Sequence, residues 1–246
     1  MSKCKKCKNG DALNFDISMA FQPIVDIKRK QIFAYEALVR TPDGGGAAQV
    51  FQKVNEHNRY AFDQACRVKA IELASQLGID TQLSINFMPN AIYDPESCIR
   101  TTLKAARQFC FPLDKLVFEF TETERVKSTT HLQNIVNHYK LRGFLTAIDD
   151  FGAGYSGLNL IADVEVDIIK IDMELIRDID KLKKKQIIVS GIVTTFQKLG
   201  SKVIVEGVET REELETLKSL GIELFQGYFI GKPAFEKLEA FSMLNT

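Results

Sequence analysis

Residues 185–226 read KQIIVSGIVTTFQKLGSKVIVEGVETREELETLKSLGIELFQ, and they alternate two helical patterns with two short apolar runs. The helical patterns are Lys185–Leu199 and Thr210–Leu220. Each ends before a glycine, the usual residue just past a helix end, and the second begins with a capping-box signature. The apolar runs, Lys202–Val205 and Glu223–Phe225, each follow one of these helices. Helix and strand therefore alternate here, which predicts an α/β fold.

The same alternation extends toward the N-terminus. Six further runs rich in β-branched and apolar residues predict strands at Met19–Val25, Ile32–Leu38, Gln82–Asn86, Leu116–Phe120, Leu145–Asp149 and Asp167–Ile171. Three further helices are predicted at Ala61–Leu77, Cys98–Phe109 and Ser128–Leu141. Several strands lack polar alternation, as strands buried on both faces do. About eight strands with helices between most of them predict a (β/α)8 TIM-like barrel.

The barrel is expected to be irregular at its start. Only a short loop separates the first two predicted strands, too few residues for a crossover helix, so we expect the first strand to pair antiparallel with the second. We predict a single barrel domain over residues 19–246, preceded by a basic N-terminal tail over residues 1–18. The tail contains Cys4 and Cys7 in a C-x-x-C arrangement with no second pair, which leaves both a plain tail and a redox or metal role open.

Composition excludes several classes of protein. The 246 residues carry 32 Lys and Arg against 32 Asp and Glu, so nothing global attracts a polyanion and we expect no DNA or RNA partner. No apolar stretch approaches the ~18 residues needed to span a bilayer, and the N-terminus does not resemble a secretory signal. We therefore expect a cytoplasmic protein without a membrane span and with reduced thiols.

Polar or charged side chains end nearly every predicted strand. They are Glu36, Asn86, Glu119, Asp149, Asp150, Lys170, Glu206 and Gln226. In such barrels the strand ends at the C-terminal face form the active site. So many carboxylates around one mouth would repel unless cations compensated them, and their hard oxygen ligands suit Mg²⁺ or Mn²⁺. Two metals close together would fit this number of carboxylates and commonly serve phosphodiester hydrolysis.

The motifs around these residues resemble those of EAL-domain cyclic-di-GMP phosphodiesterases. Glu36-Ala37-Leu38 lies within EALVR, and FQPIVD, SINF, FEFTETE, AIDDFGAGYSGL, VDIIKID, IVEGVE and FQGYF follow the order of that family. The resemblance runs from Phe21 to Pro233. It implies cyclic di-GMP as substrate and hydrolysis to linear pGpG with two Mg²⁺ or Mn²⁺ ions per site.

The resemblance also implies roles for individual residues. The family's ligands to a first metal match four positions here: Glu36, Asn86, Glu119 and Asp149. Asp149 and Asp150 together resemble the pair that bridges the metals or binds the second one. Lys170 matches a lysine that contacts the nucleophilic water or the second-metal site, and Glu206 matches a general base or metal-site residue.

Further positions match supporting and substrate-contacting residues of the family. Glu209 and Gln226 match residues that support the site and its water, and Gln22 and Arg40 match residues that contact the cyclic dinucleotide. The segment that begins at Asp150 resembles a loop that couples the metal site to dimerisation, and Glu122 matches the glutamate that anchors it. A homodimer and a regulatory protein partner are therefore expected partners.

Two alternatives remain. The chain could be a non-catalytic cyclic-di-GMP receptor or a protein-interaction module, although members of that kind typically have eroded ligands and this chain keeps them. Independently of the resemblance, a lysine that ends a barrel strand could form a Schiff base with a carbonyl substrate. The surplus of carboxylates argues against that reaction.

Overall fold

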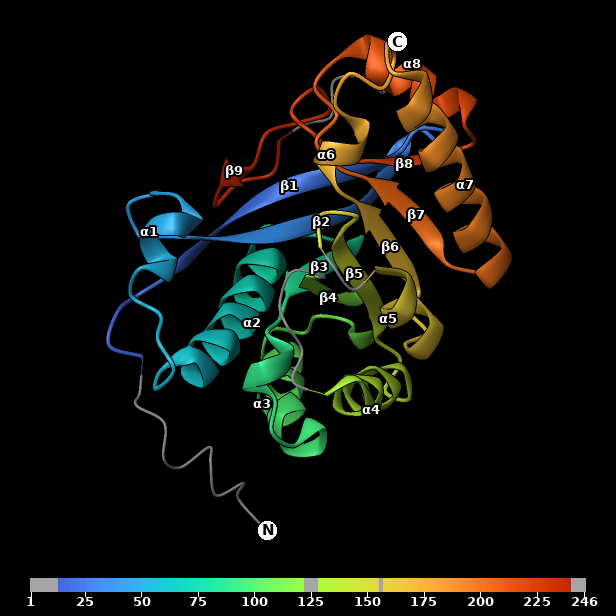
Figure 1. Ribbon diagram of the computed structural model, residues 1–246. Coiled ribbons are helices and arrows are strands. Elements are labelled where there is room, and N and C mark those ends of the chain that lie inside the picture. The colour runs from blue at the N-terminus through green and yellow to red at the C-terminus, as the bar shows by residue number, and fades with distance from the viewer. Residues whose placement is uncertain (1–12, 122–127, 155–156, 240–246) are drawn as a thin grey trace.

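The computed structural model describes residues 13–121, 128–154 and 157–239, and these form a closed barrel with helices outside it (Figure 1). Its strands are β1 (Ser18–Asp26), β2 (Gln31–Arg40), β3 (Gln82–Asn86), β4 (Leu116–Thr121), β5 (Leu145–Phe151), β6 (Ile168–Ile171), β7 (Lys202–Val205), β8 (Leu224–Phe225) and β9 (Ala234–Phe235). The strands from β2 to β8 pair in order, and β1 closes the ring between β8 and β2. The predicted (β/α)8 TIM-like barrel is confirmed.

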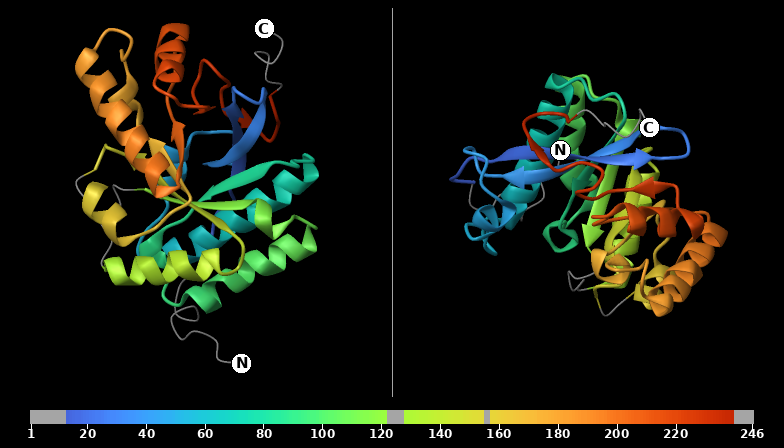
Figure 2. Two further views of the ribbon diagram at one scale, coloured as in Figure 1. Left: turned by 90° about the vertical axis from the view of Figure 1, so that its right-hand side faces the viewer. Right: turned by 90° about the horizontal axis from the view of Figure 1, so that it is seen from above.

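Helices cover the outside of this barrel, as the two views of Figure 2 show. They are α1 (Ala47–Phe51), α2 (Arg59–Gln76), α3 (Pro95–Gln108), α4 (Thr129–Lys140), α5 (Gly157–Asp163), α6 (Met173–Ile176), α7 (Lys183–Leu199) and α8 (Arg211–Ser219), with 3₁₀ turns at Pro89–Ala91 and Leu113–Lys115. Within the described ranges, none of these helices has the length and apolarity needed to cross a membrane.

The irregular start is also confirmed. β1 pairs antiparallel with β2 over its whole length, from Ser18 opposite Arg40 to Asp26 opposite Gln31. β1 also runs antiparallel to β8, whereas the pairs from β2 to β8 are all parallel. The strand β9 returns to pair antiparallel with β1, and it lies beside β1 in Figure 1.

Alternation along the strands builds the barrel interior in two layers. The layer farther from the barrel mouth is a separate apolar cluster formed by Ile24, Ala34, Val117, Ala147, Ile168, Ile204 and Leu224. Because side chains two residues apart on a strand share a face, the next inward position on each parallel strand that contributes to this cluster lies one layer closer to the mouth. These next positions are Glu36, Glu119, Asp149, Lys170, Glu206 and Gln226. The apolar layer thus forms the floor beneath a polar layer.

Four short elements lie outside the sequence predictions. They are α1, α5, α6 and β9, each of two to seven residues. A segment of this length has too few apolar positions to display a helical or strand period. The boundaries of the longer elements differ from the predicted ones by one to three residues, and β3 and β7 match them fully.

Candidate active site

Lys170 lies at the centre of the polar layer. Its side chain is fully buried, and its Nζ lies 3.2 Å from Glu36 Oε2, 2.8 Å from Glu119 Oε2, 3.0 Å from Asp149 Oδ1 and 2.5 Å from Glu206 Oε1. Three strands, β2, β4 and β5, and the residue directly after β7 therefore direct carboxylates at one ammonium from β6. With Asp150 beside them, five carboxylates gather around one cation, and this excess of negative charge favours further cations.

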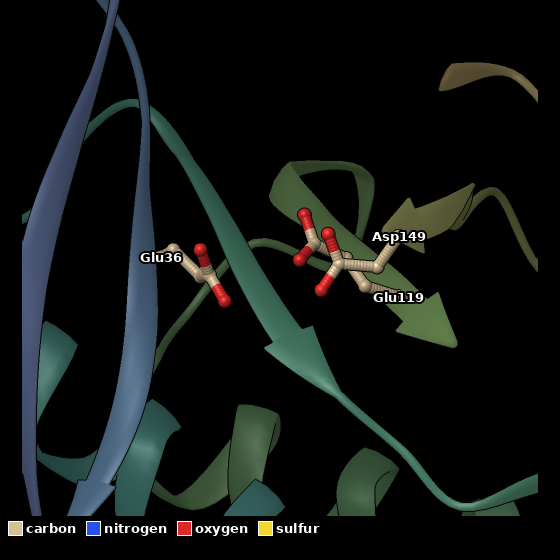
Figure 3. Close-up of side chains that lie close together, drawn as sticks. All are labelled: Glu36, Glu119 and Asp149. Atoms are coloured by element: carbon tan, nitrogen blue, oxygen red, sulfur yellow. The ribbon is translucent and has the colours of Figure 1, made fainter. Parts of the chain in front are cut away.

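Glu36 is held from several sides. Asn86 Nδ2 donates to Glu36 Oε1 at 2.8 Å, and Gln226 Nε2 donates to Glu36 Oε2 at 2.7 Å. The same Gln226 Nε2 donates to Gln22 Oε1 at 3.1 Å, and Gln22 Nε2 donates to the Gly231 carbonyl at 3.0 Å. This chain of amides fixes the Glu36 carboxylate opposite Glu119 and Asp149. Figure 3 shows the three carboxylates pointing toward one another from β2, β4 and β5.

A β-bulge brings two consecutive aspartates to the same site. Side chains of successive strand residues normally point to opposite faces. The register between β5 and β6 shifts between Ile148 and Phe151, and Asp150 has a left-handed φ of 55°. This irregularity lets a carboxylate oxygen of Asp150 group with those of Asp149 and Glu206, while Thr121 Oγ1 donates to Asp150 Oδ2 at 3.0 Å. Asp149 and Asp150 can thus act as a pair.

Burial and mutual repulsion shift the pKa values of these groups. Burial raises the pKa of Glu119 to about 8; Lys170 opposes the rise, and Glu36 and Asp149 add to it. Burial, together with Asp149, raises the pKa of Glu206 well above its ordinary value. The pKa of Asp149 is raised chiefly by burial as well. Such shifts are typical of carboxyls that lack enough positive charge around them.

Glu36 and Lys170 show the opposite balance. Burial pushes the pKa of Glu36 upward, but Lys170 and the hydrogen bonds from Gln226 and Asn86 outweigh burial and leave the pKa lowered. Burial would lower the pKa of Lys170, but the surrounding carboxylates raise it well above its ordinary value. Lys170 is therefore an ammonium, and a protonated amine is no nucleophile. This argues against Schiff-base chemistry at Lys170.

The oxygen donors fit divalent cations. Ligand atoms of Glu36, Glu119 and Asp149 lie within 4.8 Å of one another, and so do those of Asp149, Asp150 and Glu206. The two groups share Asp149, as neighbouring metal sites with a bridging carboxylate would. Gln226 Oε1 is buried with no hydrogen-bond partner among the described residues, which leaves an acceptor available beside the site. Hard oxygen donors of this kind suit Mg²⁺ or Mn²⁺.

Two cavities flank the carboxylates and share Glu36, Leu38 and Asp149 in their walls. One, of about 400 Å³, is bordered mainly by apolar residues of β2, α1, α2 and the chain after β3, including Phe51 and Met88. The other, of about 320 Å³, is more polar and extends over the ends of β7 and β8. The site therefore offers an acidic centre between two separate recesses.

Some predicted residues lie away from the centre. Glu209 is exposed and pairs with Arg177 at 3.4 Å, although it borders the 320 Å³ cavity. Arg40 is half-buried and donates from Nη1 to the Val39 carbonyl at 2.8 Å. Glu122, Cys4 and Cys7 lie outside the described residues.

The structure also adds residues that the sequence predictions lack. Ser84 Oγ donates to Glu119, and Ser84 lies two residues before Asn86, where strand alternation could have revealed it. Thr121, the donor to Asp150, likewise lies two residues after Glu119. Asp172 and Tyr228 border the 320 Å³ cavity, and Tyr228 is an exposed aromatic side chain within the FQGYF motif. Neither Asp172 nor Tyr228 occupies a position that helix or strand periodicity would single out in the sequence.

The fold and the site define a class: α/β barrels whose mouth carries an acidic cluster able to hold divalent cations. A comparison with family models matches residues 11–233 to the EAL domain. The chain belongs to the EAL domain family.

Among curated relatives, the chain is 31% identical over 214 residues to the blue light- and temperature-regulated antirepressor BluF of Escherichia coli. That match covers 87% of this chain and 53% of BluF, so the chain spans about half the length of this relative. Other relatives, at 27–33% identity, are named cyclic di-GMP phosphodiesterases.

Solved structures agree with the fold. A standalone EAL protein from Vibrio cholerae in its c-di-GMP-bound form is 53% identical with a TM-score of 0.91, and the match covers 94% of this chain and 98% of that one. The manganese and cyclic-diGMP complex of Klebsiella pneumoniae BlrP1 is 36% identical with a TM-score of 0.85, covering 92% of this chain and 58% of that one.

Proposed function

We propose that this chain is a metal-dependent phosphodiesterase that hydrolyses cyclic di-GMP to linear pGpG. The observation that carries the proposal is the presence of two clusters of three carboxylates each, which share Asp149 and lie around Lys170. The names of the relatives support the substrate, since several are cyclic di-GMP phosphodiesterases and one similar structure is a c-di-GMP-bound form.

The proposed metal ions are two Mg²⁺ or Mn²⁺ per site. Glu36, Asn86, Glu119 and Asp149 would hold the first, and Asp149 and Asp150 the second. When bound, such cations lower the pKa of a water molecule and stabilise negative charge on a phosphodiester and its leaving oxygen. The manganese complex of BlrP1 supports this choice of cation.

Within the chain, Lys170 and Glu206 are the groups that we assign to the attacking water. Lys170 is a fixed ammonium donor at the centre of the site and orients the water. Glu206 borders the 320 Å³ cavity with Oε1 2.5 Å from Lys170 Nζ, so it faces both the lysine and the space where substrate enters. We assign to Glu206 the uptake of the water proton. Gln226 Oε1, which has no hydrogen-bond partner in the described part of the chain, accepts from the water and keeps it in line.

The two cavities match a ligand with two nucleobases carried on a ring of two sugars and two phosphates. The phosphates would lie over the acidic centre, with one base in each recess. Gln22 and Arg40 are the proposed substrate contacts, and Arg40 supplies a planar donor for phosphate or base. Glu209, which borders the 320 Å³ cavity, is a proposed supporting residue, and so is Glu122, which lies outside the described residues.

We also propose that the chain acts as a homodimer that tunes the loop beginning at Asp150. The described chain exposes large apolar side chains on α5 and α7, with Leu158 73% exposed and Ile187 64% exposed. A second copy that covered these side chains would remove apolar surface from water. A dilution series tests the proposal: dissociation of the dimer should lower specific activity, and unchanged activity in the monomer would count against coupling.

The direct test of the proposed function is product analysis. The purified chain is incubated with cyclic di-GMP and Mg²⁺ or Mn²⁺, and products are separated by chromatography. We expect pGpG to form, to disappear on chelation and to return when the metal is restored.

Glu36→Gln should lower turnover at least about a hundredfold, since loss of even the residues that hydrogen-bond to metal ligands lowers metal affinity or activity 10–100-fold. Glu215→Gln on α8 is the matched control, because Glu215 is exposed and pairs only with Lys218 among the described residues. Turnover that survives both chelation and Glu36→Gln would contradict the proposal.

A second candidate function is a receptor or protein-interaction role, favoured by the similarity to BluF, an antirepressor by name. Tight binding of cyclic di-GMP without pGpG formation, under Mg²⁺ and Mn²⁺ alike, would favour it. A regulatory partner protein that switches on turnover would instead reconcile the two functions.

A further inference from the structure

Arg67 carries a charge into the interior at a place that the proposed chemistry does not use. It lies on α2, its side chain is fully buried, and its Nε lies 2.9 Å from Asp63 Oδ2. Its Nη1 donates to Tyr139 Oη on α4 at 2.8 Å. The guanidinium carbon lies 5.4 Å from the Phe87 ring centre and 5.0 Å from that of Phe118, within reach of cation–π attraction.

These contacts connect Arg67 to both sides of the acidic cluster. Asp63, the ion-pair partner, accepts from the Met88 backbone N–H at 2.9 Å through Oδ1. Met88 and Phe87 directly follow Asn86, whose side chain donates to Glu36. Phe118 directly precedes Glu119, and the Phe87 N–H donates to the Glu119 carbonyl at 2.8 Å. The guanidinium thus packs against the neighbours of two proposed metal ligands.

Fold stability alone is a weak reason for an arginine at this place. Buried ion pairs often stabilise a fold no better than apolar side chains of similar volume. Nη2 of Arg67 is buried with no hydrogen-bond partner among the described residues, which adds a further cost. A planar, permanently charged group is, however, well suited to hold a carboxylate and two aromatic rings in one fixed arrangement.

We propose that Arg67 is a positioning residue for the metal site: it holds Asp63, and through the Met88 N–H and the Phe87 ring it sets where Asn86 lies. The inference rests on the proposed function, because it takes Asn86 and Glu119 as metal ligands. Arg67 touches no reacting atom. Its effect is transmitted through the chain that follows β3.

The test measures Mn²⁺ affinity by calorimetry on the chelator-washed chain, together with the Mn²⁺ dependence of turnover. Arg67→Met should weaken Mn²⁺ binding about tenfold or more, the range found for groups that orient metal ligands, and Arg67→Lys should recover part of the loss. Ile71→Ala is the matched control. Ile71 is a fully buried residue one turn further along α2, and its truncation should lower stability without changing Mn²⁺ affinity.

Tyr139→Phe provides a milder variant if Arg67→Met fails to fold. It removes only the hydroxyl that accepts from Nη1, and we expect a smaller loss of Mn²⁺ affinity in the same direction. Unchanged Mn²⁺ affinity in folded Arg67→Met, or in Tyr139→Phe where the former does not fold, would overturn the inference. Because calorimetry needs no turnover, a wild-type chain that binds Mn²⁺ without forming pGpG would overturn the proposed function alone.

Discussion

At the scale of single residues, Asp150 shows how backbone conformation and chemistry are linked. Its left-handed φ of 55° costs energy for most residues but is tolerated by Asp and Asn, whose short side chains bond locally. The bend gives β5 a second carboxylate at the mouth. An asparagine can keep both this backbone conformation and the hydrogen bond from Thr121, so a substitution to asparagine isolates the charge.

Asp150→Asn should therefore lower turnover about tenfold or more and reduce the number of Mn²⁺ ions bound, with little loss of stability. Asp178→Asn is the matched control, because Asp178 has a φ of 56° but is exposed and pairs with Lys181. Calorimetry with Mn²⁺ and a thermal melt of both variants check the prediction. Equal turnover in the two variants would show that the Asp150 carboxylate is not needed.

At the scale of elements, the segment after β8 places Gln226 by a close approach of two backbones. A Cβ built on Gly227 would lie 2.2 Å from both the backbone N and O of Val208, where no side-chain atom fits. The Val208 N–H donates to the Gln226 carbonyl at 3.1 Å across this contact. Gly227 therefore allows the segment after β7 to pack directly against the segment after β8. This packing holds Gln226 where its side chain reaches Glu36.

Gly227→Ala should push these segments apart and lower both stability and turnover. Gly221→Ala is the control, since Gly221 has a φ of 86° with open space around it, so a Cβ there adds only backbone strain of about 1–2 kcal/mol. Urea unfolding and turnover of both variants distinguish backbone strain at the substituted residue from displacement of the two segments. We expect the larger loss of stability in Gly227→Ala and near-normal turnover in Gly221→Ala. The reverse order of stability would contradict the close-approach argument.

Much of the element pattern could be predicted from sequence because it is local. The capping box at Thr210 and Glu213, for example, forms as expected, with each side chain accepting from the other's backbone N–H. The residue that ends each predicted strand also identified the carboxylates of the barrel mouth. The bulge at Asp150 escaped prediction because it depends on the register of β5 against β6, which is a tertiary property. Asp63 and Arg67 are four residues apart on α2, so their ion pair is local. Its contact with the Met88 N–H escaped prediction, because nothing in α2 alone shows which loop it will meet.

At the scale of the whole molecule, cations that bind the folded mouth should stabilise the entire barrel. The ligands come from β2, β3, β4 and β5, so they converge only in the folded chain. At a Mn²⁺ concentration about a hundredfold above the dissociation constant, the gain is about 2.7 kcal/mol. For a chain of this size that corresponds to a rise of roughly 5–10 °C in the unfolding midpoint. Thermal melts with Mn²⁺ and with chelator check this, and Glu36→Gln should abolish the difference.

The pH dependence of the metal-free barrel follows from the crowded carboxyls. The pKa of Glu119 is about 8 in the folded chain against an ordinary value of 4.5, and Asp149 and Glu206 are also raised. A carboxyl with a raised pKa binds its proton more tightly when folded. Its stabilising contribution is complete below about pH 4.5 and is lost as the pH rises toward 8. The pKa of Glu36 is lowered, so this carboxylate makes stability depend on pH only below its ordinary pKa of 4.5, which lies outside this range of pH.

In chelator, the unfolding midpoint should therefore fall between pH 5 and pH 8, and Glu119→Gln should flatten that fall. Mn²⁺ should oppose it, because cations bind the deprotonated carboxylates and bind them better as the pH rises. The difference in midpoint between Mn²⁺ and chelator should accordingly be larger at pH 8 than at pH 6. A chelated wild-type chain that gains stability over this range would mean that the mouth already holds enough positive charge through Lys170. The site would then have little need of divalent cations.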